Sequence, residues 1–148
     1  MKRGFTIMEL ALVLAIIALL AFMGISALTR FRSSALLDQT HAEIVTALNE
    51  ARGMTLASKE GDVYGVHFEA NEIVRFKGSS YATSSPNNAS TTLDARVRIE
   101  SIDIVSGHDV VFQRLTGATA NTGTVVVVVT SDSSRRATTS ILASGIIE

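Results

Sequence analysis

GFTIMELALVLAIIALLAFMGISAL, residues 4–28, is the stretch that decides the fold. From Phe5 onward it stays apolar for as many residues as a helix needs to cross a bilayer core, which is about 20 at roughly 1.5 Å of rise each. Lys2 and Arg3 stand just before it, and the positive-inside bias keeps such an end cytoplasmic. The sequence therefore predicts a membrane-spanning helix over residues 5–28, with the rest of the chain extracytoplasmic.

Glu9 is the one charged residue inside this apolar stretch. A carboxylate at the centre of a membrane costs about 2.5–3.5 kcal/mol, and less near an end, so it indicates a function and needs a partner. Cleavage after Gly4 would supply that partner, because Phe5 would then carry a new terminal ammonium. In a bundle of like helices, Glu9 would neutralise this amine on an adjacent copy where water is excluded. The pattern predicts an assembly device.

The run MKRG followed by FTIMEL resembles the class III signal of type IV pilins and type II secretion pseudopilins. The resemblance implies cleavage between Gly4 and Phe5 by a prepilin peptidase, N-methylation of Phe5, and Glu9 as the glutamate at the fifth mature position. The chain departs from the pattern at Ser26, where many pilins have proline. Any helix kink there would have to come from Gly24 and Ser26.

Two simpler interpretations of the N-terminal stretch remain. An ordinary secretory signal has a small-residue cleavage site after its apolar core, for which Ala21 and Ala27 are available. That interpretation leaves Glu9 unexplained. A plain single-span anchor would make Glu9 incidental.

Composition limits the rest of the chain to one domain with a modest core, because only 148 residues are present. Loss of Lys2 and Arg3 with the leader would remove two positive charges and take the formal charge from −1 to −3, before the new amine is counted. No overall basic excess favours a nucleic-acid partner. The chain has no cysteine, so disulfides and thiolate metal sites are excluded.

Beyond Leu28, apolar residues recur at three- and four-residue steps to about Thr55, which indicates an amphipathic helix. The predicted fold class is α+β and pilin-like: one long N-terminal helix over about residues 5–58, its first half transmembrane, packed on a C-terminal antiparallel β domain. The predicted parts of the chain are a leader peptide at residues 1–4, a transmembrane and assembly helix at 5–28, an amphipathic half-helix at 29–60, and an antiparallel β globular domain at 61–148.

A period of two replaces the helical period from Asp62. It predicts a hairpin of residues 64–68 and 73–77, a polar loop at 78–92 around Pro86, and further strands at 97–104, 110–112, 125–129 and 137–142. The apolar run at 125–129 suits a strand covered on both faces.

The run ARGMTLASKEGDVYGVHF, residues 51–68, is similar to the helix end and first strand of GspH/FimT-type minor pilins. That resemblance implies a minor pseudopilin or pilin, a structural subunit of a type II secretion pseudopilus or type IV pilus that supports protein secretion. It implies as partners other subunits, the prepilin peptidase, an inner-membrane assembly platform, and membrane lipid before assembly. The expected location is the cytoplasmic membrane, with the N-terminus cytoplasmic and the domain periplasmic, and then the fibre. A major pilin subunit is an alternative.

The sequence predicts neither an enzyme nor a cofactor. His41, His67 and His108 lie in three different elements, and no pair has the spacing of a zinc motif. We expect one of them on a helix face and two on the surface. Gly-rich phosphate loops and serine-nucleophile elbows are also missing from the sequence.

A second alternative is a FimT-like minor pilin that binds DNA for uptake. Basic residues form three pairs along the predicted strands and turns: Arg75 with Lys77, Arg96 with Arg98, and Arg135 with Arg136. If they converged they would contact a phosphate backbone, with Arg135 and Arg136 as the candidate contacts. Acidic residues are interspersed, which is typical of a solvated strand face and cancels much of the field.

Overall fold

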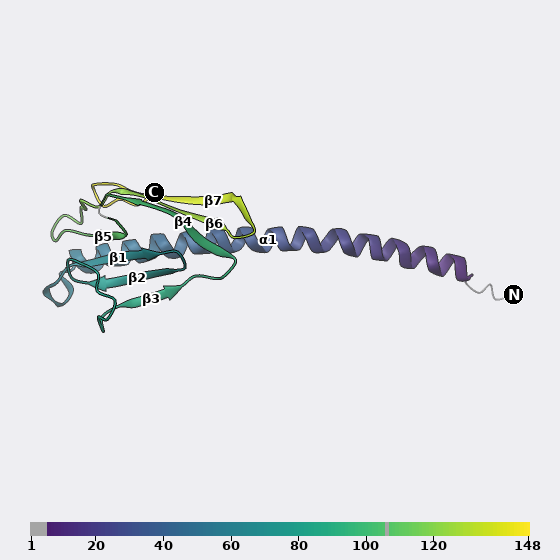
Figure 1. Cartoon of the computed structure of the whole chain (residues 1–148), viewed down its shortest axis with the longest axis horizontal. Coiled ribbons are helices and arrows are strands. Elements are labelled where there is room, and N and C mark those ends of the chain that lie inside the picture. Colours follow the sequence, from purple (N-terminus) through teal and green to yellow (C-terminus); the bar gives the residue numbers. More distant parts are fainter. Residues whose placement is uncertain (1–5, 106) are drawn as a thin grey trace. The chain divides into compact units, whose positions relative to one another are not determined.

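The computed structural model of the chain describes residues 6–105 and 107–148, with the backbone alone at residues 23–30. The chain divides into two compact units, Met1–Ser33 and Ser34–Glu148. The second unit contains the strands and the C-terminal part of the helix (Figure 1).

Helix α1 runs from Ile7 to Leu56. Thr6 precedes it and accepts a hydrogen bond at its Oγ1 from the backbone N–H of Glu9, at 3.2 Å. Thr at the N-cap with Glu three residues later is the capping-box pattern, which explains why the helix begins at Ile7. The helix ends at Leu56, two residues before its predicted end at residue 58. Ser58 adopts a left-handed φ of 48°. The short 3₁₀ helix η1 (Lys59–Gly61) then leads into the strands.

The predicted fold class is wrong as stated. Side chains of α1 are described in two segments, residues 7–22 and 31–56, and neither is a long apolar helix. Within the described residues, no helix combines the length and the hydropathy needed to cross a membrane. Among the described side chains the apolar run of α1 covers residues 7–22, fewer than the about 20 residues that a span of the bilayer core needs.

The strands of the described residues form two sheets, and all paired strands are antiparallel (Figure 1). The four-stranded sheet has the order β3-β2-β1-β5, and the three-stranded sheet has the order β4-β6-β7. Their bounds are β1 (Tyr64–Glu69), β2 (Glu72–Lys77), β3 (Ala89–Thr92), β4 (Val97–Ile104), β5 (Asp109–Val111), β6 (Gly123–Val129) and β7 (Asp132–Ile141).

The hairpin predicted from the period of two is confirmed, since β1 pairs with β2 from Tyr64↔Lys77 to Glu69↔Glu72. The loop predicted at residues 78–92 is partly wrong, because its last four residues form β3 on the open edge of β2. All four residues of β3 are exposed, so they bury no apolar face that a sequence pattern could reveal.

One hydrophobic core lies between the C-terminal half of α1 and both sheets. Ile44, Leu48 and Ala51 of the helix are fully buried in it. They meet alternate residues of the strands: Tyr64, Val66, Phe68, Ile73, Val97, Ile99, Val125, Val127 and Ile141. Thr55 ties the helix end to β1, because its Oγ1 donates to the Ala51 carbonyl and accepts from the Tyr64 N–H, both at 2.9 Å. The domain is thus closed around its own core.

A second apolar layer covers the opposite face of the four-stranded sheet. Tyr81, from the segment between β2 and β3, stacks on the His67 ring with centroids 3.9 Å apart. The ring of Phe76 lies 5.8 Å from that of Tyr81 and is buried. Gly65 makes room for it, since a methyl group there would lie 2.6 Å from the Phe76 Cζ. The polar segment after β2 therefore contributes to packing through Tyr81.

Candidate functional site

Large apolar side chains are exposed along residues 7–22 of α1. Their exposed fractions range from 43% at Val13 to 89% at Ile7. They follow one another closely enough to surround the helix: Ile7, Met8, Leu10, Leu12, Val13, Leu14, Ile16, Ile17, Leu19, Leu20 and Phe22. A helix that is apolar on all sides is stable in water only when other apolar groups cover it. This segment is the first candidate interaction site.

Glu9 lies in the first turn of this segment and is exposed. Its N–H is capped by Thr6, and an acidic side chain at this position interacts favourably with the helix dipole. The N-cap at Thr6 is a local feature that the sequence analysis missed, although the T-x-x-E spacing signals it. The predicted pairing of Glu9 with a neighbour's amine stays a prediction.

Gly4 and Phe5, the predicted cleavage residues, lie outside the described residues, as does the predicted leader at residues 1–4. Predicted N-methylation at Phe5 falls there too.

Arg135 and Arg136 point to opposite faces of β7. The guanidinium of Arg135 donates to the Ser34 Oγ of α1 at 2.9 Å and lies 3.4 Å from the Asp132 carboxylate. Arg136 is exposed on the outer face. Successive residues of a strand alternate between its faces, so these two cannot form one patch. DNA contact by the pair stays a prediction that this arrangement does not favour.

The strand register brings a different pair of basic residues together. Val128 of β6 stands opposite Arg98 of β4 on one side and Arg136 of β7 on the other. Directly paired residues share a face, so both arginines lie on the outer face of the three-stranded sheet, about 10 Å apart at their Cα atoms. Sequence reasoning missed this pair because it depends on the register of strands far apart in the chain.

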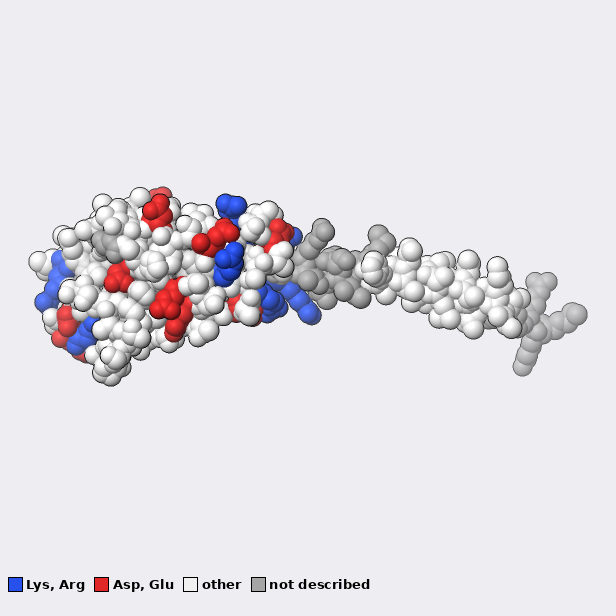
Figure 2. All heavy atoms as spheres, in the orientation of Figure 1, with Lys and Arg blue, Asp and Glu red and all other residues white. Residues whose placement is uncertain are grey.

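Ion pairs neutralise most of the predicted basic positions, Arg98 included, and acidic and basic side chains are interspersed over the domain face seen in Figure 2. The pairs are Arg75 with Glu50, Lys77 with Glu60, Arg96 with Asp94, and Arg98 with Glu100. Such ion pairs leave little net positive charge to attract a polyanion such as DNA.

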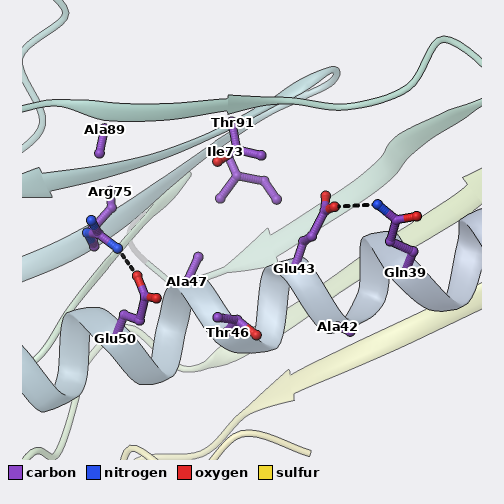
Figure 3. Close-up of a pocket in the computed structure, with 10 residues that line it drawn as sticks. All are labelled: Gln39, Ala42, Glu43, Thr46, Ala47, Glu50, Ile73, Arg75, Ala89 and Thr91. Atoms are coloured by element: carbon purple, nitrogen blue, oxygen red, sulfur yellow. Dashed lines mark hydrogen bonds and ion pairs between the residues drawn. The ribbon is translucent and has the colours of Figure 1, made fainter.

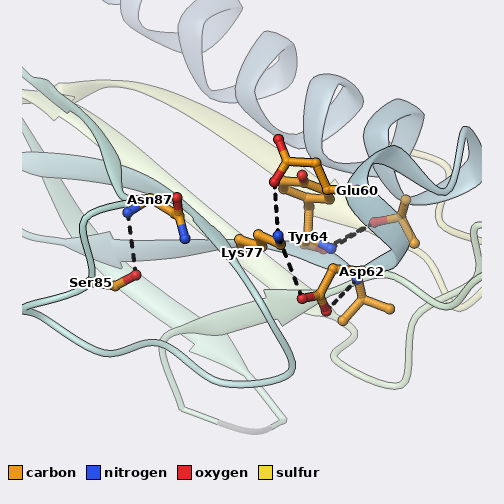
Figure 4. A network of polar contacts seen from close by, with 8 residues as sticks. Glu60, Asp62, Tyr64, Lys77, Ser85 and Asn87 are labelled. Carbon is orange, nitrogen blue, oxygen red and sulfur yellow. Dashed lines mark hydrogen bonds and ion pairs between the residues drawn. The ribbon is translucent and has the colours of Figure 1, made fainter.

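Two of these pairs shift the pKa of their members. A side-chain hydrogen bond from Arg96, with a further one from its backbone N–H, holds the pKa of Asp94 well below its usual value. Lys77 donates to Glu60 at 2.8 Å, which lowers the pKa of Glu60 and raises that of Lys77. Figure 4 shows Lys77 between Glu60 and Asp62, joining the end of β2 to η1.

His67 lies between two carboxylates and is largely buried, contrary to the predicted surface position. Its Nδ1 is 2.5 Å from the Asp109 Oδ1, and its Nε2 is 3.5 Å from the Glu69 Oε1. His108 lies nearby, with ring centroids 6.0 Å apart. Throughout residues 6–105 and 107–148, no group of three or more histidine, aspartate or glutamate side chains is arranged to hold a metal ion. The cluster anchors Tyr81 and β5 to β1.

A groove of about 360 Å³ separates α1 from the edge of the four-stranded sheet (Figure 3). The helix contributes Ala47 and Glu43, among others, and the sheet contributes Ile73 and Thr91. Glu50 and Arg75 close one end with their ion pair. The groove is apolar at its floor and acidic at its rim, and its size lies at the small end of ligand pockets.

The chain matches no protein-family model, no curated protein and no solved structure.

Proposed function

We propose that the protein is a structural subunit of a pilin-like or pseudopilin-like filament, which assembles through its N-terminal helix. The observation that carries the proposal is the exposure of large apolar side chains on every side of residues 7–22, in a chain whose domain already has a closed core. Packing against like helices of neighbouring subunits would remove this surface from water, which is favourable by about 25 cal/mol per Å².

Processing between Gly4 and Phe5 is part of the proposal, and it rests on the sequence signal. The new amine of Phe5 would pair with Glu9 of an adjacent subunit and set the axial register of the helices. In a water-excluded bundle, removal of one partner of such a pair costs about 3–5 kcal/mol.

The experiment must separate this charge pair from the capping box. Glu9→Gln removes the charge, but it keeps a side chain that is suitable for the capping box. Thr6→Ala removes the cap and keeps the charge. Asp38→Asn, at an exposed acid of the domain, is the control for loss of one negative charge.

Assembly of the full chain is measured as the fraction recovered in sheared, sedimented filaments, and the mature N-terminus is read by mass spectrometry. We expect Glu9→Gln to lower assembly at least tenfold with normal processing, and Thr6→Ala and Asp38→Asn to assemble normally. If Thr6→Ala fails as severely as Glu9→Gln, the role of Glu9 is to start the helix. A mature chain that does not begin at Phe5 would overturn the proposal.

A further inference from the structure

The segment between β5 and β6 presents an exposed leucine at its apex. Leu115 is 90% exposed and has a left-handed φ of 71°. Both features are unfavourable for a leucine, and residues held in sparsely populated backbone conformations cluster at functional sites. A glycine or an asparagine would adopt this conformation more easily. A leucine at this position therefore points to a contact with a surface outside the domain.

The apex is held in place by hydrogen bonds on both sides. Gln113 donates its N–H to the Ala118 carbonyl at 2.8 Å, and Gly117 donates to the Gln113 carbonyl at 2.9 Å. The Arg52 Nε of α1 donates to the Gly117 carbonyl at 3.0 Å. Leu115 is thus presented by a fixed turn, which lowers the entropy lost when it binds.

Arg114, next to Leu115, is exposed, and none of the described acids forms an ion pair with it. The apex therefore offers an apolar side chain beside an unpaired positive charge.

The groove between α1 and the four-stranded sheet offers the complementary surface. Ala47 and Ile73 line its floor, as Figure 3 shows. Glu43 on its rim accepts a hydrogen bond from the Gln39 Nε2 at 2.9 Å, and no cation among the described side chains pairs with it. A volume of about 360 Å³ accommodates a few side chains and excludes a whole helix.

We propose that Leu115 of one subunit inserts into this groove of the next copy of the chain, with Arg114 beside Glu43. The two surfaces lie on different parts of the domain, so the contact is heterologous. Such a contact repeats from copy to copy and builds an open chain of subunits unless the rotation closes a ring. The inference rests on the proposed function, to which it adds a second contact between subunits and a requirement that copies of this chain be neighbours.

Disulfide cross-linking tests the contact directly, because the chain has no cysteine of its own. Full-length Leu115→Cys and Ala47→Cys variants, carrying tags of different mass, are mixed in mild detergent and oxidised. Detergent covers the apolar N-terminal segment, so the readout depends on the domains and not on helix assembly. Leu115→Cys mixed with Thr138→Cys, an exposed position on β7, is the control.

We expect at least about fivefold more mixed dimer from the Leu115 and Ala47 pair than from the control, since a disulfide needs Cα atoms within about 7 Å. An equal yield from both pairs would overturn the inference, even where filament assembly through Glu9 is upheld.

A charge exchange gives a second readout on the same cross-link. Glu43→Arg should lower the yield severalfold by placing two cations together, and Arg114→Glu on the partner should restore it. Asp38→Arg makes the same change of charge at an exposed acid elsewhere on α1 and should leave the yield unchanged. Failure of Arg114→Glu to restore the yield would exclude Glu43 as the partner.

Discussion

Residues 7–22 and the domain from Ser34 onward use apolar side chains in opposite ways. In the domain, Phe68, Val66 and Ile44 are fully buried against one another. In the N-terminal segment, side chains of the same kinds are exposed, with Phe22 at 77%. The apolar side chains of the domain are covered by other parts of the chain, whereas those of residues 7–22 are exposed.

This difference separates the stability of the domain from the proposed assembly of subunits. Burial in the domain contributes to the free energy of folding, at roughly 1.5–3 kcal/mol for each large side chain. Exposed apolar residues of the segment contribute only when another surface covers them. Substitutions in the two regions should therefore change different measurements.

The largest expected effect comes from removing a core ring. Phe68→Ala should lower the free energy of unfolding by about 3–5 kcal/mol, because it leaves a cavity among α1 and β1 residues that pack closely. Urea unfolding of the full chain, followed by circular dichroism, measures it. Phe22→Ala is the matched control and should leave the unfolding midpoint unchanged. Equal shifts of the unfolding midpoint for both variants would show that Phe22 contributes to folding as much as Phe68 does.

Substitutions of two glycines should change the stability by smaller amounts, and in opposite directions at a packed and at an open position. Gly65→Ala would place a methyl group 2.6 Å from the Phe76 Cζ and 2.7 Å from the Val110 carbonyl oxygen. We expect a loss of about 1–3 kcal/mol. Gly53→Ala in α1 meets nothing within 4 Å and should raise stability by up to about 1 kcal/mol. Thermal unfolding of the two variants shows whether they move in opposite directions.

The smallest expected effect concerns the exposed pair of Asp94 and Arg96. Because Arg96 lowers the pKa of Asp94 in the folded chain, the pair contributes stability above the unfolded pKa of about 3.9, and this is lost as the pH falls. The melting temperature of the natural chain should thus fall more between about pH 5 and pH 2.5 than that of Asp94→Asn. Identical pH dependence would show that the pair does not stabilise the domain.

Local sequence patterns predicted the secondary-structure elements whose hydrophobic pattern extends over only a few neighbouring residues. Alternation from Tyr64 to Lys77 was enough to predict the hairpin, which the strand register confirms. The four-residue β3 was missed because its exposed Ala, Ser and Thr side chains carry no hydrophobic signal. Tyr81 was assigned to a polar loop because the residues around it are polar, although it stacks on a histidine of β1.

The sequence by itself determined that an apolar N-terminal segment with a single acid precedes an amphipathic helix and a set of strands, because hydrophobic periodicity is a property of neighbouring residues. Tertiary structure alone decided that Arg135 and Arg136 lie on opposite faces, that Arg98 and Arg136 flank Val128, and that a groove opens between α1 and β3. These features depend on strand register and on packing between residues far apart in the chain, about which local spacing carries no information.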